Sequence, residues 1–450
     1  MRSDDMRRYL LAVVVGLVVL RLLGPSWRTG FPPPFPDSSS YVAVASLGPF
    51  HPGFWFAQRP PVYPLLIWLV GPSYRSVVVA QTLVAVVAWA WLWSTVWEQV
   101  RNRWVASAAL VLLVAIAVET RWVFWNTAVL TESLSGSLAI AMITAWWRWW
   151  VQPGRFRLVA AVVLTSVWML VRDSNAVSMV AVAVVASVVV VVMERRHPSA
   201  RRRGLALALS VVLATGAFSL AGQFHSERGA TSLHNDVGLR WLPDGEMRAW
   251  ATARGMPVDD ALLARTGADA WADGQAFLVD PGLARYRQWA NGSGRLVAGA
   301  SFVVKVDWYL RHYWEDLPSY TATDHLSYDT FHVAERFPER PLGPFDPTGS
   351  RTTVMISLAV LLAGSALLLA RSRTLGWLAA FWTVPVVADL YLSYVSDAIE
   401  VGRHLVGPLQ RLSVVTILVT ALAIDSLIPG RTGVEGSHEL DAGQTREVAA

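Results

Sequence analysis

The sequence contains no cysteine. Disulfides, thiolate nucleophiles and cysteine-based metal sites are therefore excluded. Charged residues are also scarce, at 16% of the 450 residues, whereas hydrophobic residues make up 54% and tryptophan occurs 23 times. The apolar residues form repeated runs of membrane-spanning length. This composition excludes an ordinary soluble enzyme and predicts an integral membrane protein whose first partner is the lipid bilayer.

Internal repeats and low-complexity segments are not evident in the sequence. The formal net charge is +5, but the basic residues are nearly all arginines in short clusters beside apolar segments. Such clusters are typical of a topology signal, because Lys and Arg are retained on the cytoplasmic side of a membrane. No basic patch with interleaved aromatic residues is present, so we expect no nucleic-acid partner.

Uncharged apolar stretches of about 20 residues predict an all-α polytopic membrane protein with about ten transmembrane helices. The first predicted helix is interpreted as retained, because no small-residue cleavage site follows it. The predicted helices lie near residues 9–27, 75–97, 104–119, 129–148, 157–171, 174–193, 204–223, 352–370, 374–396 and 404–427.

Arginine clusters follow alternate predicted helices, which places both termini in the cytoplasm of a multi-pass cell-membrane protein. The opposite, outer face then receives a long first loop, residues 28–74, and a small, mostly helical extracytoplasmic domain. The predicted organisation is an N-terminal transmembrane module (1–223), the extracytoplasmic domain (224–351), C-terminal transmembrane helices (352–428) and a disordered cytoplasmic tail (429–450).

The first outer loop has an unusual composition. It contains FPDSSSYVAVA and, about twenty residues later, RPPVYPLL at residues 59–66. Asp37, Tyr41 and the RPPVYPLL segment resemble the first extracytoplasmic loop of the GT-C superfamily of polytopic glycosyltransferases. The resemblance includes protein mannosyltransferase-like and actinobacterial arabinofuranosyltransferase-like members, and it extends over the helical layout to about residue 200.

This resemblance implies a sugar donor linked to a polyprenyl phosphate and an acceptor that is a glycan, a lipid or a protein. Asp37 is then the candidate base, while Tyr41, Arg59 and Tyr63 are candidate substrate-binding residues. The transfer needs a carboxylate base, a cation for the departing phosphate and a groove at membrane level. The alternative is that Asp37 is only a helix N-cap, since DSSSYVAVA is also a good helix start. Family members often have two adjacent acids here, whereas this loop has one acid followed by serines.

Glu132 is a second candidate catalytic acid, at the outer end of the fourth predicted helix and just after Thr131, a candidate helix cap. An acid at this position also resembles the superfamily. It would orient the substrate of Asp37 or hold a neighbouring cation. The alternative is an acid that only favours the helix dipole in the first turn. No cofactor is assigned and no metal-ligand spacing is present, although a divalent cation bridging Asp37, Glu132 and phosphate stays open.

Three cationic residues are candidates for the donor phosphate. Arg172 is expected at an outer helix end, and Arg403 with His404 at the outer turn before the last helix. The planar fork of Arg binds two phosphate oxygens and stays charged. The alternatives are that these arginines anchor lipid headgroups, or that Arg403 simply pairs with Asp397 and Glu400.

Two further charged groups carry predictions. Asp389 and Arg411 are expected about two turns below the outer surface, where unpaired charges are costly, so we predict a buried ion pair. Its role is either structural or to line a groove for the lipid phosphate. The segment DWYLRHYWEDLPSYTATDH, which starts at Asp307, mixes aromatic residues and carboxylates. It is interpreted either as a sugar-binding surface or as an amphipathic helix on the membrane.

The polar residues collect on one predicted face, which favours an enzyme over a transporter or flippase of a lipid-linked sugar. A third class, a partner-binding membrane protein, leaves the arrangement of the first loop unexplained. The sequence therefore predicts an inverting glycosyltransferase that uses a polyprenyl-phosphate donor at the outer face of the cytoplasmic membrane.

Overall fold

The computed structural model describes residues 35–196, 199–225, 228–321, 350–396, 398–399 and 401–429, and part of residues 8–19. Every regular element within these residues is a helix, and they contain no strand. The prediction of an all-α protein is confirmed for this part of the chain. Most of the predicted first helix and nearly all of the predicted cytoplasmic tail lie outside the described residues.

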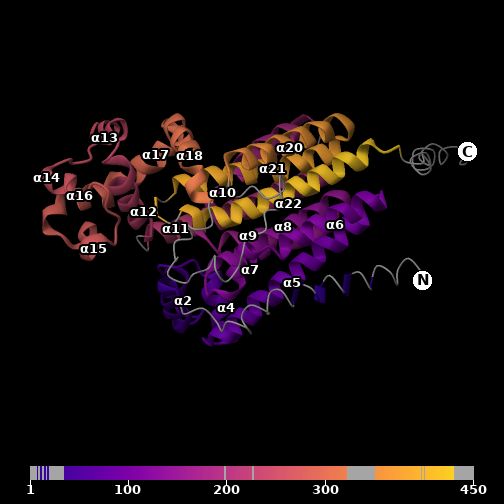
Figure 1. The fold of residues 1–450 in the computed structure, drawn as a ribbon, viewed down its shortest axis with the longest axis horizontal. Helices are drawn as coiled ribbons and strands as arrows, with labels where there is room; N and C mark the ends of the chain where they lie inside the picture. The colour runs from indigo at the N-terminus through magenta and orange to yellow at the C-terminus, as the bar shows by residue number, and fades with distance from the viewer. Residues whose placement is uncertain are drawn as a thin grey trace, which may run out of the picture.

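Long helices form one bundle with roughly parallel axes (Figure 1). The last of them, α22, lies at its centre, because its apolar window is 89% buried whereas those of the other long apolar helices are at most 56% buried. It packs against α6, α8, α20 and α21. The bundle consists of α5 (Tyr74–Gln99), α6 (Arg103–Ala117), α8 (Thr131–Val151), α9 (Arg155–Met169), α10 (Asp173–Arg196), α11 (Ala200–His225), α20 (Arg351–Arg371), α21 (Arg373–Val395) and α22 (Val401–Leu427).

Six of these helices are long and apolar enough to cross a membrane, namely α5, α10, α11, α20, α21 and α22. Their outward-facing residues are apolar, as on α10, where Val184, Val185 and Val188 are exposed. Such a surface needs an apolar solvent, so the chain is a membrane protein. The predicted count of about ten spans is not confirmed within the described residues: α6 and α9 have 15 residues each, α8 begins with the polar residues Thr131, Glu132 and Ser133, and most of the predicted first span lies outside the described ranges.

One end of the bundle is closed by Asp425, in the last turn of α22. Its carboxylate accepts hydrogen bonds from the backbone amides of Arg101 and Asn102, at 3.2 and 2.8 Å. The Asn102 side chain in turn caps α6 by accepting from the amides of Trp104 and Val105. These contacts fix the start of α6 to the end of the central helix.

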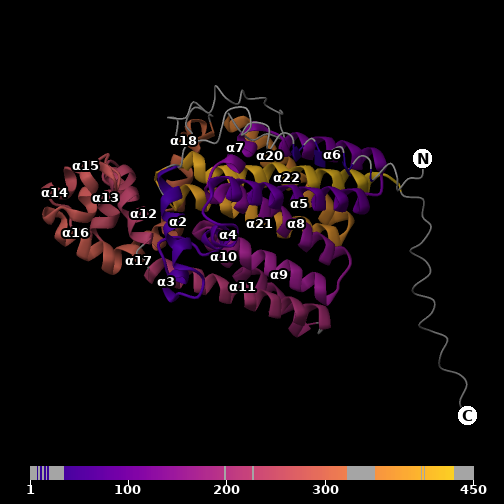
Figure 2. The same ribbon diagram turned by 90° about the horizontal axis from the view of Figure 1, so that it is seen from below.

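The opposite end of the bundle carries the peripheral helices, residues 228–321 (Figures 1 and 2). Their shared core contains Trp241, Tyr286, Trp308 and Tyr309, all almost fully buried. The helices are α12 (Arg228–Asp236), η1 (Val237–Trp241), α13 (Gly245–Thr252), α14 (Asp260–Leu263), α15 (Ala272–Val279), η2 (Pro281–Leu283), α16 (Ala284–Trp289), η3 (Ala290–Gly294), α17 (Arg295–Val304) and α18 (Val306–Thr321).

Aromatic residues of α21 join the peripheral helices to the bundle. The hydroxyl of Tyr394 donates to Asp316 on α18 at 2.8 Å, and the guanidinium of Arg240 lies 4.3 Å from the centre of the Tyr394 ring. One turn earlier, the hydroxyl of Tyr391 donates to the carbonyl of Phe302 at 2.7 Å. The peripheral helices are therefore bound to the bundle by specific polar contacts.

The described part of the predicted first loop is folded into short helices. They are α2 (Pro36–Leu47), α3 (Pro52–Trp55) and α4 (Val62–Val70), and α7 (Thr120–Thr127) lies near them. Figure 2 shows α2, α3 and α4 at the end of the bundle that faces the peripheral helices. This end, termed the peripheral end below, holds the candidate site.

Candidate functional site

Helix α2 places Asp37 at the peripheral end. Phe35 precedes the helix and is buried against Phe124 and Trp125, with ring centres 6.2 and 6.3 Å away. Pro36 at the first helical position favours a helix start there. The hydroxyl of Ser38 donates to the carbonyl of Val129, at 2.9 Å and buried. These contacts fix the first turn of α2, and with it Asp37, against the segment before α8.

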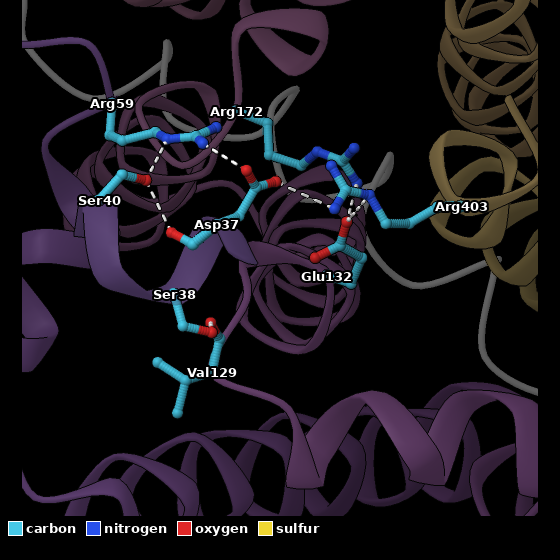
Figure 3. Close-up of polar contacts among 8 residues, drawn as sticks. All are labelled: Asp37, Ser38, Ser40, Arg59, Val129, Glu132, Arg172 and Arg403. Carbon is cyan, nitrogen blue, oxygen red and sulfur yellow. Dashed lines mark hydrogen bonds and ion pairs between the residues drawn. The ribbon is translucent and has the colours of Figure 1, made fainter. Parts of the chain in front are cut away.

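Arg59 reaches Asp37 from the segment before α4 (Figure 3). Its guanidinium donates to Oδ1 of Asp37 at 2.6 Å and to the hydroxyl of Ser40 at 2.7 Å. It also lies over the ring of Tyr41, 4.8 Å from the ring centre, and Tyr41 packs edge-on against Tyr63 at 5.1 Å. The two parts of the loop that carried the family resemblance are therefore in direct contact.

Arg403 joins Asp37 to Glu132. Its Nη1 lies 3.1 Å from Oδ2 of Asp37, and its Nε lies 3.3 Å from Oε1 of Glu132. Arg172 approaches the same glutamate oxygen at 3.6 Å. The result is an alternating chain of charges, Arg59, Asp37, Arg403, Glu132 and Arg172, contributed by α2, α8, α22 and two connecting segments (Figure 3). We call these five residues the terminal charge cluster.

The terminal charge cluster contains three arginines and two carboxylates, so its formal charge is +1. Its exposure decreases from Arg59 and Asp37, whose side chains are 27% and 23% exposed, to Glu132 at 2%. Burial opposes ionisation of Asp37, but the charges and hydrogen bonds of Arg59 and Arg403 outweigh it and lower the pKa of this carboxyl below its usual value. Asp37 is therefore ionised at neutral pH, in a cluster with a surplus cation.

Three other predicted residues surround the terminal charge cluster without being linked to it by an ion pair among the described residues. Tyr41 supports Arg59, as described above. Tyr63 is buried, and its hydroxyl donates to Oε1 of Gln81 at 3.1 Å. His404 follows Arg403 on α22 and lies within electrostatic range of Arg403 and Arg172. Their proposed contacts with substrate stay predictions.

Two predicted helix caps are wrong. The residue that caps α2 is Phe35, and Asp37 lies inside the first turn, where its carboxylate binds arginines and makes no cap bond. Helix α8 begins at Thr131 with Leu130 as its cap residue, and no side chain caps it. Glu132 does lie in the first turn of α8, where an acid is favoured by the helix dipole. The suggested partners of Arg403, Asp397 and Glu400, lie outside the described residues.

The bridging cation that the sequence left open can be compared with the geometry. In the structure the group that bridges Asp37 and Glu132 is the guanidinium of Arg403. A divalent cation between the two carboxylates would have to displace this side chain. In the described ranges no group of three or more His, Asp or Glu residues is arranged to hold a metal ion.

The predicted buried pair of Asp389 and Arg411 is confirmed. The two side chains form an ion pair and are 2% and 5% exposed. Ser178 on α10 donates to Oδ1 of Asp389 at 2.9 Å, and the guanidinium of Arg411 lies 5.2 Å from the ring centre of Trp168 on α9. The pair therefore ties α21 and α22 to their neighbours inside the bundle.

The aromatic and acidic segment that starts at Asp307 forms most of α18. Trp308 and Tyr309 are buried, and His312 stacks on Trp308 with ring centres 4.0 Å apart. The rings of Trp308 and Tyr309 pack inside the peripheral helices and offer no open face to a sugar, whereas the side chain of His312 is 30% exposed. Leu310 and Trp314 are 49% and 42% exposed, as expected of an amphipathic helix.

Two residues that the sequence did not single out also organise the site. Gln81 accepts from Tyr63 and donates to the carbonyls of Asn126 and Ala128, at 2.7 and 2.8 Å. Ser40 accepts from Arg59 and donates to the carbonyl of Asp37 at 2.6 Å. A lone amide within the apolar run VVVAQTLVAVV was a usable signal for Gln81, because polar groups inside membrane helices need partners.

Comparisons of the chain with family models, with curated proteins and with solved structures find no match. The functional argument therefore depends on the geometry of the terminal charge cluster and on the chemistry of its residues.

Proposed function

We propose that the protein is an inverting glycosyltransferase that moves a sugar from a polyprenyl-phosphate donor to an acceptor hydroxyl. The observation that supports this function is the meeting of Asp37, Glu132, Arg172 and Arg403 in the terminal charge cluster, whose five residues together carry a formal charge of +1. These residues come from distant parts of the chain. Their contact brings a carboxylate and two phosphate-binding cations to one end of an apolar bundle, which are the groups that the reaction needs.

In the proposed reaction, Asp37 and the arginines of the cluster have different roles. Asp37 accepts the proton of the acceptor hydroxyl while the hydroxyl oxygen of the acceptor bonds to the anomeric carbon. The bond between that carbon and the phosphate oxygen breaks on the opposite side, and its electron pair leaves with the polyprenyl phosphate. Arg403 and Arg172 stabilise this departing charge, since guanidinium groups bind phosphate oxygens strongly.

The lowered pKa of Asp37 fits this sequence of events. In the structure Arg403 contacts Asp37 and Glu132 together, and this contact is one cause of the low pKa. A donor phosphate would compete for the same guanidinium. Weakening the contact between Arg403 and Asp37 returns the pKa of the carboxyl towards its ordinary value and makes it a stronger base. Donor binding thus prepares the base for the acceptor.

The arginine pattern supports a location at the outer face of the cytoplasmic membrane, with both termini in the cytoplasm. Arg101, part of one of the arginine clusters expected in the cytoplasm, contacts Asp425 at one end of the bundle. The terminal charge cluster includes Asp37 on α2, and α2 lies at the other, peripheral end (Figure 1). The site would therefore open towards the outer side, where the glycosyltransferases that the first loop resembles use lipid-linked sugars.

The test is sugar transfer by the purified protein in nanodiscs, with a panel of polyprenyl-phosphate sugars and membrane-derived acceptors. Asp37→Asn is compared with the parent and with Glu98→Gln. Glu98 is a matched control, because it pairs with Arg148 at 3.0 Å and is 30% exposed, yet lies at the far end of the bundle. We expect transfer by the parent and the control, and loss of transfer in a folded Asp37→Asn protein.

Two other outcomes are informative. If Asp37→Asn still transfers sugar, the protein is an enzyme and Glu132 takes the place of Asp37 as the proposed base. A parent that binds a lipid-linked sugar without consuming it favours a transporter or flippase instead.

A further inference from the structure

A small cavity lies directly behind Glu132, inside the bundle. Its volume is about 20 Å³, which is room for roughly one or two water molecules. Glu132 is the one residue that belongs both to this cavity and to the terminal charge cluster. The cavity is lined by Ala85, Trp89, Ala117, Trp122, Trp125, Asn126, Glu132, Ser133, Ser137, Val406, Gly407 and Gln410.

Two polar atoms of the lining residues have no hydrogen-bond partner among the described residues. They are Oε2 of Glu132, an acceptor, and Nε1 of Trp125, a donor. The two residues are 5% and 2% exposed. Buried polar groups are nearly always hydrogen-bonded in native proteins, because leaving one without a partner is costly. The cavity therefore offers one unmet donor and one unmet acceptor.

Two hydroxyl groups of the wall are already engaged. The hydroxyl of Ser133 donates to Oδ1 of Asn126 at 2.8 Å, and the hydroxyl of Ser137 donates to the carbonyl of Ser133 at 2.8 Å. Among the fully buried polar atoms of the wall, those without a partner are thus on Glu132 and Trp125, and the amide of Gln410 adds a further polar group to the lining. A hydroxyl group matches it, because a hydroxyl donates one hydrogen bond and accepts others.

The size of the cavity restricts what can enter. About 20 Å³ accommodates a single hydroxyl or hydroxymethyl group, whereas a whole sugar ring is far larger. Indole rings of Trp89, Trp122 and Trp125 form part of the wall, and aromatic surfaces suit the apolar carbon of such a group. Oε1 of Glu132 contacts Arg403 and Arg172, so the carboxylate of Glu132 connects the cavity to the terminal charge cluster.

We propose that this cavity binds one hydroxyl-bearing arm of the transferred sugar and thereby determines which sugar is accepted. The proposal rests on the proposed glycosyltransferase function. A water molecule has the same hydrogen-bonding chemistry as the sugar hydroxyl, and the experiment has to distinguish these two sources. Because a site built to bond a hydroxyl rejects the analogue without it, the distinguishing quantity is selectivity between donors.

The experiment compares kcat/KM for a donor that the parent transfers with kcat/KM for each of its monodeoxy analogues. Trp125→Phe retains an aromatic ring and removes the indole N–H. The matched control is Trp147→Phe, because Trp147 on α8 is also fully buried with an unpartnered N–H but does not line the cavity. Ser137→Thr is the second variant and adds one methyl group to the cavity wall. Thermal unfolding verifies that each variant is folded.

We expect the parent to reject one deoxy analogue by a factor of ten or more, on the order expected for a lost hydrogen bond to a buried group. In Trp125→Phe this factor falls about tenfold, while Trp147→Phe retains it. Ser137→Thr lowers kcat/KM for the natural donor more than for that analogue, because the added methyl group competes with the hydroxyl.

Unchanged selectivity in both Trp125→Phe and Ser137→Thr, with transfer by the parent intact, overturns the proposal and leaves a cavity that holds water only. If the parent transfers no sugar from any donor, the proposed function fails first and this assignment fails with it. The two failures are therefore distinguishable by the activity of the parent.

Discussion

Helix α22 carries two arginines, Arg403 and Arg411, in two charge clusters of different kinds. Arg411 pairs with Asp389 deep in the bundle, where both side chains are at least 95% buried and the charges balance. Arg403 lies in the terminal charge cluster, where three arginines share two carboxylates and the outermost groups are about one quarter exposed. A balanced, enclosed pair offers an anion neither a surplus charge nor access from outside the bundle. An unbalanced, accessible cluster has both the charge and the access that an anion needs.

The comparison assigns stability to one cluster and chemistry to the other. The two arginines are eight positions apart, just over two helical turns, so both side chains project from similar faces of the same helix. Sequence spacing alone does not distinguish them. The difference comes from their partners, and each partner can be removed separately.

The largest expected effect is on stability, in Asp389→Asn. This change leaves Arg411 buried without its counter-charge, which typically costs about 3–5 kcal/mol. We expect the free energy of unfolding, measured by denaturant titration in detergent, to fall by this amount, while transfer per folded molecule stays at the parental level. The double variant Asp389→Leu, Arg411→Met is the control, because it removes both charges and should regain most of the loss.

A folded Asp389→Asn protein that has lost transfer contradicts this assignment. That result would place Asp389 and Arg411 along the path of the lipid phosphate, as the alternative interpretation of the sequence has it.

The second prediction removes the charge of Arg403 instead. Arg403→Gln is expected to lower kcat/KM by about 100-fold, since an anion contact made mainly in the transition state is lost. Its stability should change less than that of Asp389→Asn, because the cluster retains two arginines for two carboxylates. Arg403→Lys retains the charge but loses the planar fork. Its kcat/KM should lie between those of the parent and of Arg403→Gln.

The contrary outcome for Arg403 is a variant with normal transfer and reduced stability. Both clusters on α22 would then be structural, and the comparison between them would fail.

The third prediction concerns pH. The pKa of Asp37 is lowered, with burial opposing the arginines, so in the parent the ionised carboxylate is present at all pH values above the ordinary range near 4. Arg59→Gln removes one of the two compensating charges and leaves the effect of burial less opposed. The pKa then rises, and protonation of Asp37 moves the acid limb of the kcat/KM profile to higher pH.

We expect kcat/KM of the parent to be flat between pH 7.5 and 5, and that of Arg59→Gln to fall about tenfold over the same interval. Arg265→Gln is the control, since Arg265 also contacts two carboxylates, at 2.7 and 3.0 Å, but belongs to the peripheral helices. Parallel profiles for parent and Arg59→Gln would contradict the role of Asp37 as the titrating base.

Much of this arrangement was predictable from the sequence. Apolar runs gave the helices at nearly the right residues, because membrane-spanning segments must satisfy their own backbone hydrogen bonds. The pairing of Asp389 with Arg411 followed from the cost of isolated charges at that depth. The proline and tyrosine stretch RPPVYPLL pointed to the first loop, where Arg59 and Asp37 meet.

Other features depended on three-dimensional contacts that no local pattern encodes. Asp37 was also readable as a helix cap, and only the structure shows that Phe35 is the cap residue of α2 and that Arg59 and Arg403 bind the carboxylate of Asp37. The cavity behind Glu132 combines residues of α5, α7, α8 and α22, together with the last residue of α6, so its lining cannot be read from any single segment. The unmet groups of Trp125 and Glu132 are visible only after all other partners have been placed.

The smallest effect is expected from Ser178→Ala, which tests how completely the buried pair is enclosed. The hydroxyl donates to Oδ1 of Asp389 at 2.9 Å, and a hydrogen bond to a charged, buried group contributes about 1.5–3 kcal/mol at most, with partial compensation by rearrangement. We expect the free energy of unfolding to fall by about 1 kcal/mol and sugar selectivity to stay unchanged. Ser210→Ala on α11 is the control, because that exposed hydroxyl bonds only to its own helix, at the carbonyl of Ala206. A stability loss in Ser178→Ala no larger than in Ser210→Ala would mean that water reaches Asp389, and the distinction between an enclosed and an accessible cluster on α22 would no longer hold.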